Sequence, residues 1–423
     1  MLLLNLVAVA GGSVTWHPFE LDGEVGIGYG VAVADVDGDG DLDVILADRD
    51  NLAWYENPLK EGLRSVSPAD QADPSSTAAG SRSGHLVPGP GVPPAWRKHV
   101  LTGKLSELDH VCVAARDLDG DGRAEVAAGA TWNPGDTFQS GSVHALVPGE
   151  DRMQLWSASS LPHEPTTHRM RWVRLAPGRF GLAVLPLHGR GNVDGTGEGV
   201  RILLYEPPKS PVESWTITPI AESGLSLHFT HNLDVVQWDP DPDEEILVAA
   251  REGVWLLDRT GGSWTSRALI DRVSNPDFQG ASEVRSGRLQ SGRRFISVVE
   301  PFHGNHLVLY AQGNEPESWR RMVLDDSLMQ GHAIAVGDFE GCGFDQVAAG
   351  WRQKNADQKV GVKCYVPDAD GNLASVHWVD DSMACEDLCA ADFEQDGRLD
   401  LVASGRDSHN LRIYFNRSVE RAR

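Results

Sequence analysis

Residues 28–57 read GYGVAVADVDGDGDLDVILADRDNLAWYEN, and this stretch decides the fold. An apolar strand runs into a turn of alternating acidic residues, which is followed by a second apolar strand, a short loop and a third strand. Related units begin at six later positions, which are His110, His168, His231, Ser282, His332 and Glu386. Regular repetition of a three-strand unit is typical of closed all-β rings. The sequence therefore predicts an all-β fold, a seven-bladed β-propeller.

Tryptophans mark a fourth strand in most of these units. They stand at positions 96, 156, 215, 264, 319 and 378, which serves six of the seven units. The segment VTWHPFEL at residues 14–21 precedes the first unit and has nothing of its own to pair with. We expect it to form the outer strand of the last blade and so close the ring, which leaves only short, protected edges. Residues 1–423 then form one domain of four-stranded blades.

The composition excludes several classes of partner. The net charge of −24 argues against nucleic acid and against an anionic membrane surface. Residues 1–13 are either the remnant of a secretion leader or a first strand, so exported (periplasmic) and cytoplasmic locations are expected equally. No later segment is long and apolar enough to cross a membrane. Residues 58–94 are rich in Pro, Gly, Ser and Ala and are expected to form a disordered surface loop.

Acidic turns join the first and second strands of three units. Hard cations such as Ca²⁺ or Mg²⁺ need six to eight oxygen ligands, and Gly-relieved turns let successive carboxylates converge. Strands rather than helices flank these turns, which excludes an EF-hand. We predict structural calcium there, and Asp239–Glu245 is a weaker fourth candidate. The predicted ligands are Asp35, Asp37, Asp39, Asp41 and Asp43, then Asp117, Asp119, Asp121 and Glu125, and finally Asp392, Glu394, Asp396 and Asp400.

The strand starts should form the opposite rim, around the axis. The positions six residues before each acidic turn are Tyr29, Val111, His168, His231, Ser282, His332 and Glu386, with His110 one residue off the register. Three histidines from different blades plus an open position suit a catalytic zinc ion or another divalent transition metal. Glu386 or His110 would be a fourth ligand or the general base. Alternatively, each histidine only caps a strand start and bonds a neighbouring carbonyl.

Aromatic, Arg, Asn and His side chains share this rim and suit a polyhydroxylated ligand. The predicted substrate-binding residues are Tyr29, Trp132, His188, Arg190, Asn305, Trp351, Arg352 and Arg406, and His303 lies in the same set of loops. The chain contains no nucleophile elbow, phosphate loop or dinucleotide fingerprint.

The acidic turns resemble FG-GAP or VCBS repeats. The His-rich strand starts, LDHVCVAARDLDGDG, PTTHRMRWV, FTHNLDVVQW and MQGHAIAVGDF, are similar to the propeller domain of aldos-2-ulose and 1,5-anhydrofructose dehydratases. That resemblance implies a zinc site on His168, His231 and His332 that dehydrates a keto-sugar, with His110 or Glu386 as base. A protonated His303 would assist the leaving hydroxyl.

The resemblance has one departure. The bifunctional fungal enzymes continue into cupin domains that isomerise the product, whereas this chain ends soon after LRIYFN, so we expect no isomerase activity. The expected function is that of a metal-dependent carbon–oxygen lyase acting on a keto-sugar, such as 1,5-anhydrofructose or a 3-keto-glycoside. The alternative is a non-catalytic calcium-loop propeller that binds glycan or protein.

Overall fold

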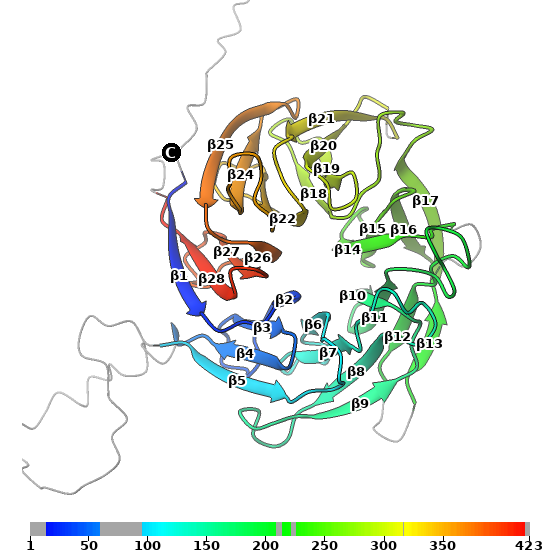
Figure 1. Cartoon of the computed structure of the whole chain (residues 1–423), viewed down its shortest axis with the longest axis vertical. Coiled ribbons are helices and arrows are strands. Elements are labelled where there is room, and N and C mark those ends of the chain that lie inside the picture. The colour runs from blue at the N-terminus through cyan, green and yellow to red at the C-terminus, as the bar shows by residue number, and fades with distance from the viewer. Residues whose placement is uncertain (1–13, 60–94, 209–213, 221–225, 316, 419–423) are drawn as a thin grey trace, which may run out of the picture.

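Seven four-stranded antiparallel sheets form a ring in the computed structural model (Figure 1). The structure describes residues 14–59, 95–208, 214–220, 226–315 and 317–418. The segment expected to be a leader remnant, residues 1–13, lies outside the described residues, as does most of the expected surface loop, residues 60–94. Each sheet is one blade, and its first strand faces the axis of the ring in Figure 1.

The blades take their strands in chain order. Blade 1 contains β2 (Gly30–Ala34), β3 (Asp43–Ala47), β4 (Leu52–Glu56) and β5 (Arg97–Thr102), and blade 2 contains β6 (Cys112–Arg116), β7 (Glu125–Ala130), β8 (Ser142–Val147) and β9 (Ser157–Leu161). Blade 3 contains β10 (Thr167–Ala176), β11 (Arg179–Pro186), β12 (Leu203–Glu206) and β13 (Thr216–Pro219), and blade 4 contains β14 (Thr230–Val236), β15 (Glu245–Ala250), β16 (Gly253–Thr260) and β17 (Ser263–Asp271). Blade 5 contains β18 (Val284–Arg288), β19 (Arg294–Glu300), β20 (His306–Gln312) and β21 (Trp319–Asp325), and blade 6 contains β22 (Gly331–Gly337), β23 (Gln346–Trp351), β24 (Gly361–Pro367) and β25 (Leu373–Asp380). Blade 7 contains β26 (Cys385–Ala391), β27 (Asp400–Gly405), β28 (Asn410–Asn416) and β1 (Trp16–Asp22).

The N-terminal strand closes the ring, as the sequence predicts. β1 pairs antiparallel with β28, from Trp16 opposite Asn416 to Asp22 opposite Leu411. The Trp16 ring packs edge-on against Phe339 of the neighbouring blade, with 5.8 Å between centroids. The end of β1 also binds blade 1, because Asp22 Oδ2 accepts hydrogen bonds from Tyr55 Oη and Lys98 Nζ, each at 2.6 Å. One short strand therefore joins blades 6, 7 and 1.

The hydrophobic core lies between adjacent blades. Ile45 and Trp54 of blade 1, for example, pack in one buried cluster with Val113 and Val126 of blade 2. The predicted tryptophans either lie within the fourth strands or stand directly before them. All five cysteines are free. Among the described residues, no helix has the length and apolar character needed to cross a membrane.

The topology separates two rims. Turns between first and second strands lie at one end of the ring. The starts of the first strands and the loops between second and third strands lie at the other. The acidic turns and the histidine-bearing strand starts therefore occupy opposite ends of the axis, as expected.

Candidate metal centre

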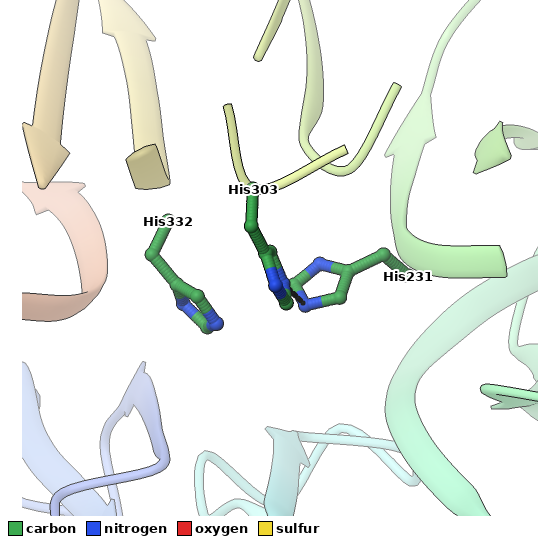
Figure 2. A group of neighbouring side chains, drawn as sticks. All are labelled: His231, His303 and His332. Carbon is green, nitrogen blue, oxygen red and sulfur yellow. Dashed lines mark hydrogen bonds between the residues drawn. The ribbon is translucent and has the colours of Figure 1, made fainter. Parts of the chain in front are cut away.

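Three histidines from three adjacent blades converge near the axis (Figure 2). His231 lies on β14, His332 on β22, and His303 on the loop between β19 and β20. Each offers one ring nitrogen, and these nitrogens all lie within 4.8 Å of one another. The Nε2 atoms of His231 and His303 are 2.6 Å apart. Such a distance requires one shared proton, which an incoming metal ion would displace.

Hydrogen bonds on the far side of two rings decide which nitrogen faces the group. His231 Nδ1 lies 2.9 Å from Glu283 Oε1 and 3.2 Å from the Ser282 carbonyl. His332 Nδ1 lies 2.7 Å from the Glu386 carbonyl. These oxygens accept only, so Nδ1 carries the proton and Nε2 keeps its lone pair. The simpler interpretation, a bond to a neighbouring carbonyl, therefore holds for one nitrogen and leaves the other available.

His168 lies outside this group. Its Nδ1–H donates to the His231 carbonyl at 2.8 Å, and its Nε2 lies 3.2 Å from Arg169 Nη1. Arginine only donates, so the one ring-nitrogen lone pair of His168, on Nε2, is already used. The ring packs against Trp132 with 4.8 Å between centroids. The structure thus brings His303 into the group in place of the expected His168.

Burial keeps the imidazoles neutral. It is the main cause that lowers the pKa of His231, His303 and His332 well below the usual value for histidine. The positive charge of Arg352 lowers the pKa of all three further. A metal ion needs the neutral ring, so this environment prepares the group to bind one near neutral pH.

A clamped carboxylate stands next to the three histidines. Glu386 accepts from Arg352 Nη1 at 2.9 and 3.1 Å and from Arg406 Nη1 at 3.0 Å. Its Oε1 lies 3.8 Å from His332 Nε2. The Arg406 guanidinium also lies over the ring of Tyr29, 5.5 Å from its centroid, and Tyr29 Oη donates to Asp109 at 2.7 Å. Of the expected rim residues, Glu386, Arg352, Arg406 and Tyr29 thus form one connected set.

Other expected residues have local partners. His110 Nδ1 bonds the carbonyls of Asp48 and Arg49, each at 3.1 Å, and its Nε2 accepts from the Leu105 N–H at 3.1 Å. Both ring nitrogens are therefore committed, which leaves no lone pair for a base. Trp351 is fully buried in the core, and its indole N–H donates to the Lys359 carbonyl at 2.9 Å.

Two loop residues also bond nearby groups. Arg190 donates to the Phe138 carbonyl at 3.0 Å and lies 3.4 Å from Glu164. Asn305 donates to the Asp326 carbonyl at 2.9 Å.

Sequence analysis missed an aromatic stack beside the histidines. The His188 ring stacks on Phe229 at 4.5 Å between centroids, and Phe229 stacks on Phe302 at 4.1 Å. Phe302 then contacts the His231 ring edge-on at 5.3 Å. Phe229 and Phe302 stand one or two residues from histidines in FTHN and PFHGNH, and that proximity was the available signal. Sequence analysis also missed Glu283, and its position directly after the counted residue Ser282 was the available signal.

The acidic turns differ from one another. Single oxygens of Asp35, Asp37 and Asp39 converge within 4.8 Å, and so do those of Asp117, Asp119 and Glu125. In blade 7 two of the four carboxylates pair with arginines, Glu394 with Arg417 and Asp396 with Arg398. Calcium in these three turns stays a prediction.

The fold and the site define a class, a closed seven-bladed propeller with a buried histidine group at one end of its axis. Residues 141–313, from β8 to β20, match the family model described as the β-propeller domain of aldos-2-ulose dehydratase. This segment is less than half of the chain and includes His231 and His303 but not His332. The match confirms the resemblance read from the strand starts.

The other comparisons concern the fold. No curated protein matches the chain. A solved structure titled "Crystal structure of BBS1N in complex with ARL6DN, soaked with mercury" is similar, with a TM-score of 0.52 and 14% identity over 96% of this chain and 97% of that one. At this identity the likeness shows the fold alone.

Proposed function

We propose that this propeller is a metal-dependent carbon–oxygen lyase. It eliminates water, or a related leaving group, from a keto-sugar such as 1,5-anhydrofructose or a 3-keto-glycoside. The observation that carries this proposal is the convergence of His231, His303 and His332 within 4.8 Å, in surroundings that hold them neutral. The family match over residues 141–313 supports the same reaction class.

The donor set fits zinc. Three neutral imidazoles with an open position are a usual catalytic zinc arrangement, and a carboxylate on the outer nitrogen of one ring, here Glu283 on His231, is a usual support. A bound zinc ion supplies a Lewis acid that polarises the ketone of the substrate and acidifies the neighbouring C–H. Since His303 belongs to this set, it is not free to act as the acid that the resemblance implies.

Glu386 is the base that we propose. Of the two expected bases, it is the one beside the histidine group, whereas both nitrogens of His110 are committed. Glu386 takes the proton from the carbon next to the ketone, and the bond from the adjacent carbon to its hydroxyl breaks. The same carboxyl returns the proton to the departing oxygen, so water leaves and an enone remains. Arg352 and Arg406 hold the carboxylate in one orientation.

The aromatic stack gives the sugar a surface. Phe302 contacts both His231 and His303, so an apolar ring face adjoins the proposed metal position. Sugar rings carry apolar C–H faces that pack on aromatic rings, and a further aromatic ring, Trp132, packs against His168. We propose that these rings orient the substrate.

The test is His231→Ala in the full chain. We expect loss of both zinc binding and the ultraviolet absorbance of the enone when 1,5-anhydrofructose or a 3-keto-glycoside is supplied. His377→Ala, on the outer strand β25, is the matched control and should keep both. If His231→Ala retains zinc and activity, the site is wrong. If the zinc-loaded protein consumes no keto-sugar, the proposed dehydratase activity is wrong. Binding of glycan or protein by the zinc-free protein would then favour the non-catalytic propeller.

The ligand set has its own test. His303→Ala should lose zinc while His168→Ala keeps it, as measured by metal content after gel filtration. The reverse result would restore the set predicted from the strand starts.

A further inference from the structure

Blade 4 carries a second group of acidic residues, remote from the histidines. Asp239 lies in the turn before β15, Glu245 begins β15, and Asp258 lies on β16. One oxygen of each lies within 4.8 Å of the others. Glu245 is fully buried, with an exposed fraction of 0%. Burying a carboxylate beside two others is costly unless something compensates the charge.

The sheet itself forces two of these carboxylates together. Ile246 of β15 pairs with Leu257 of β16, which brings Glu245 next to Asp258. Like charges at such positions destabilise a sheet. Glu245 Oε2 accepts a hydrogen bond from the Trp238 N–H at 2.6 Å, but Oε1, also buried, has no hydrogen-bond partner in the described part of the chain.

Blade 1 contains the same acidic pair in a satisfied form. Val44 pairs with Tyr55, so Asp43 lies next to Glu56. The oxygens of Asp43 accept from the backbone N–H groups of Val36 and Asn57, at 2.8 and 2.9 Å. Glu56 is bound by His99 at 2.7 Å and by Arg97 at 3.4 Å. The comparison shows what blade 4 lacks, namely a second donor on the buried carboxylate and a cation on its neighbour.

The arginines near this turn are engaged with other groups. Arg259 bonds Asp243 and the Leu175 carbonyl, each at 2.6 Å. Arg294 lies over the Trp238 ring at 4.0 Å and donates to the Trp238 carbonyl, and Glu245 attracts its charge without an ion pair between them. Within the described ranges, no Lys or Arg forms an ion pair with Asp239, Glu245 or Asp258.

The centre of the turn is also filled. Gln237 stands where blade 1 has Asp35, and its Nε2 lies 2.6–3.0 Å from the carbonyl oxygens of Asp239, Asp241 and Asp243, to which its two hydrogens donate. An ion at the centre of this turn would meet an amide nitrogen instead of a carboxylate. Glu245, whose buried Oε1 has no partner among the described residues, instead shares a space with Asp239 and Asp258, where one oxygen of each residue lies within 4.8 Å of the others.

We propose that Asp239, Glu245 and Asp258 bind one hard divalent cation, Ca²⁺ or Mg²⁺, with waters completing its shell. The ion replaces the missing donor on Glu245 Oε1 and screens the Glu245–Asp258 repulsion. The site is independent of the histidine centre and of the proposed lyase activity.

The experiment counts Ca²⁺ bound by the metal-stripped full chain in equilibrium dialysis. Glu245→Gln and Asp258→Asn should each bind one ion fewer than the wild type. Asp243→Asn removes the same charge from the same turn, but its carboxylate is held by Arg259, so the number of ions should not change. Without divalent ions, Glu245→Gln should melt at or above the wild-type temperature, because it removes an unpaired buried charge. Added Ca²⁺ should raise the melting temperature of the wild type more than that of Glu245→Gln.

Two results would overturn the proposal. If both variants bind as many ions as the wild type, these carboxylates are not ligands. If Ca²⁺ raises the melting temperatures of wild type and Glu245→Gln equally, a proton or a water satisfies Oε1. Should Glu245→Gln fail to fold, the partly exposed Asp258 carries the test.

Discussion

Glu283 and Asn232 hold the outer nitrogen of His231. Glu283 is fully buried, its Oε1 lies 2.9 Å from His231 Nδ1, and its Oε2 accepts from Asn232 Nδ2 at 2.6 Å. Both carboxylate oxygens are thus used, and the ring cannot rotate without breaking a buried bond. Burial raises the pKa of Glu283, an effect that the charges of Arg285 and Arg169 oppose.

This contact makes a quantitative prediction for Glu283→Gln. An amide presents one oxygen and one NH₂, so it cannot accept from both His231 and Asn232. Supporting residues of this kind usually change metal affinity by roughly 10–100-fold when mutated. We expect a loss of that size for zinc, measured by competition with a chelator, with an unchanged circular dichroism spectrum. Unchanged affinity would mean that Glu283 does not position the ring.

At this scale the sequence supplied part of the site. Counting six residues back from the acidic turns found His231 and His332, because equivalent strand starts point the same way in every blade. It could not find His303, which reaches the group from a loop whose path the repeat does not determine. Nor could it show that Arg169 uses the lone pair of His168, because that contact depends on rotamers. Trp351 is in the rim register, but its ring turns into the core.

At the scale of elements, the acidic turn shows how a repeated motif diverges. The residue that begins the second strand caps the turn in blades 1, 2, 4 and 7, accepting from a backbone N–H of the same turn. What differs is its second oxygen, which meets a backbone N–H in blades 1 and 7. The motif was recognisable from its spacing alone. The partner of the second carboxylate oxygen was not, because the donors, Asn57 and Asn416, stand at the end of the third strand of the blade.

The turn of blade 1 predicts a pH dependence for Asp43→Asn. Burial is the main cause that raises the pKa of Asp43 from its usual 3.8 to about 8. The folded protein therefore holds a proton on Asp43 that the unfolded chain has released, and the contribution of Asp43 to stability falls as the pH rises from 4 to 8. Asn cannot ionise, so we expect the variant to gain on the wild type by about 1.4 kcal/mol per pH unit in that range.

The measurement is urea unfolding in chelator at several pH values. Asp400→Asn is a second variant, and its effect should end near pH 7, the raised pKa of Asp400. Parallel stability curves for variant and wild type would contradict the prediction.

At the scale of the whole molecule, the fold was predictable because its evidence is repetitive. Seven units, six following tryptophans and one displaced strand leave few arrangements other than a closed ring, and pairing of β1 with β28 confirms the closure. The sequence could not show that β1 also binds blade 1 through Asp22, because Tyr55 and Lys98 lie far away along the chain.

Deleting residues 1–24 tests the closure. The deletion removes the edge of blade 7, the Trp16–Phe339 contact and the bonds of Asp22. Loss of one buried tryptophan side chain alone typically costs about 3–5 kcal/mol, so we expect a larger loss in the free energy of unfolding. Trp378→Ala, at a 47% exposed tryptophan of the outer strand β25, is the control and should cost much less. A truncated chain that melts like the full one would disprove the closure.

Because of the displaced strand, two distant parts of the chain build blade 7, namely β1 and the segment from β26 to β28. β1 follows no other described strand, and its backbone bonds all lead to a sheet built by the opposite part of the chain. The N–H of Arg417 bonds the Thr15 carbonyl at 2.8 Å, so the two parts meet as neighbours in space. A peptide carrying this strand is therefore a natural complementation fragment. Added to the truncated chain, it would restore the missing edge strand in trans. The propeller could then serve as a split reporter in which binding of the peptide is detected by the completion of blade 7.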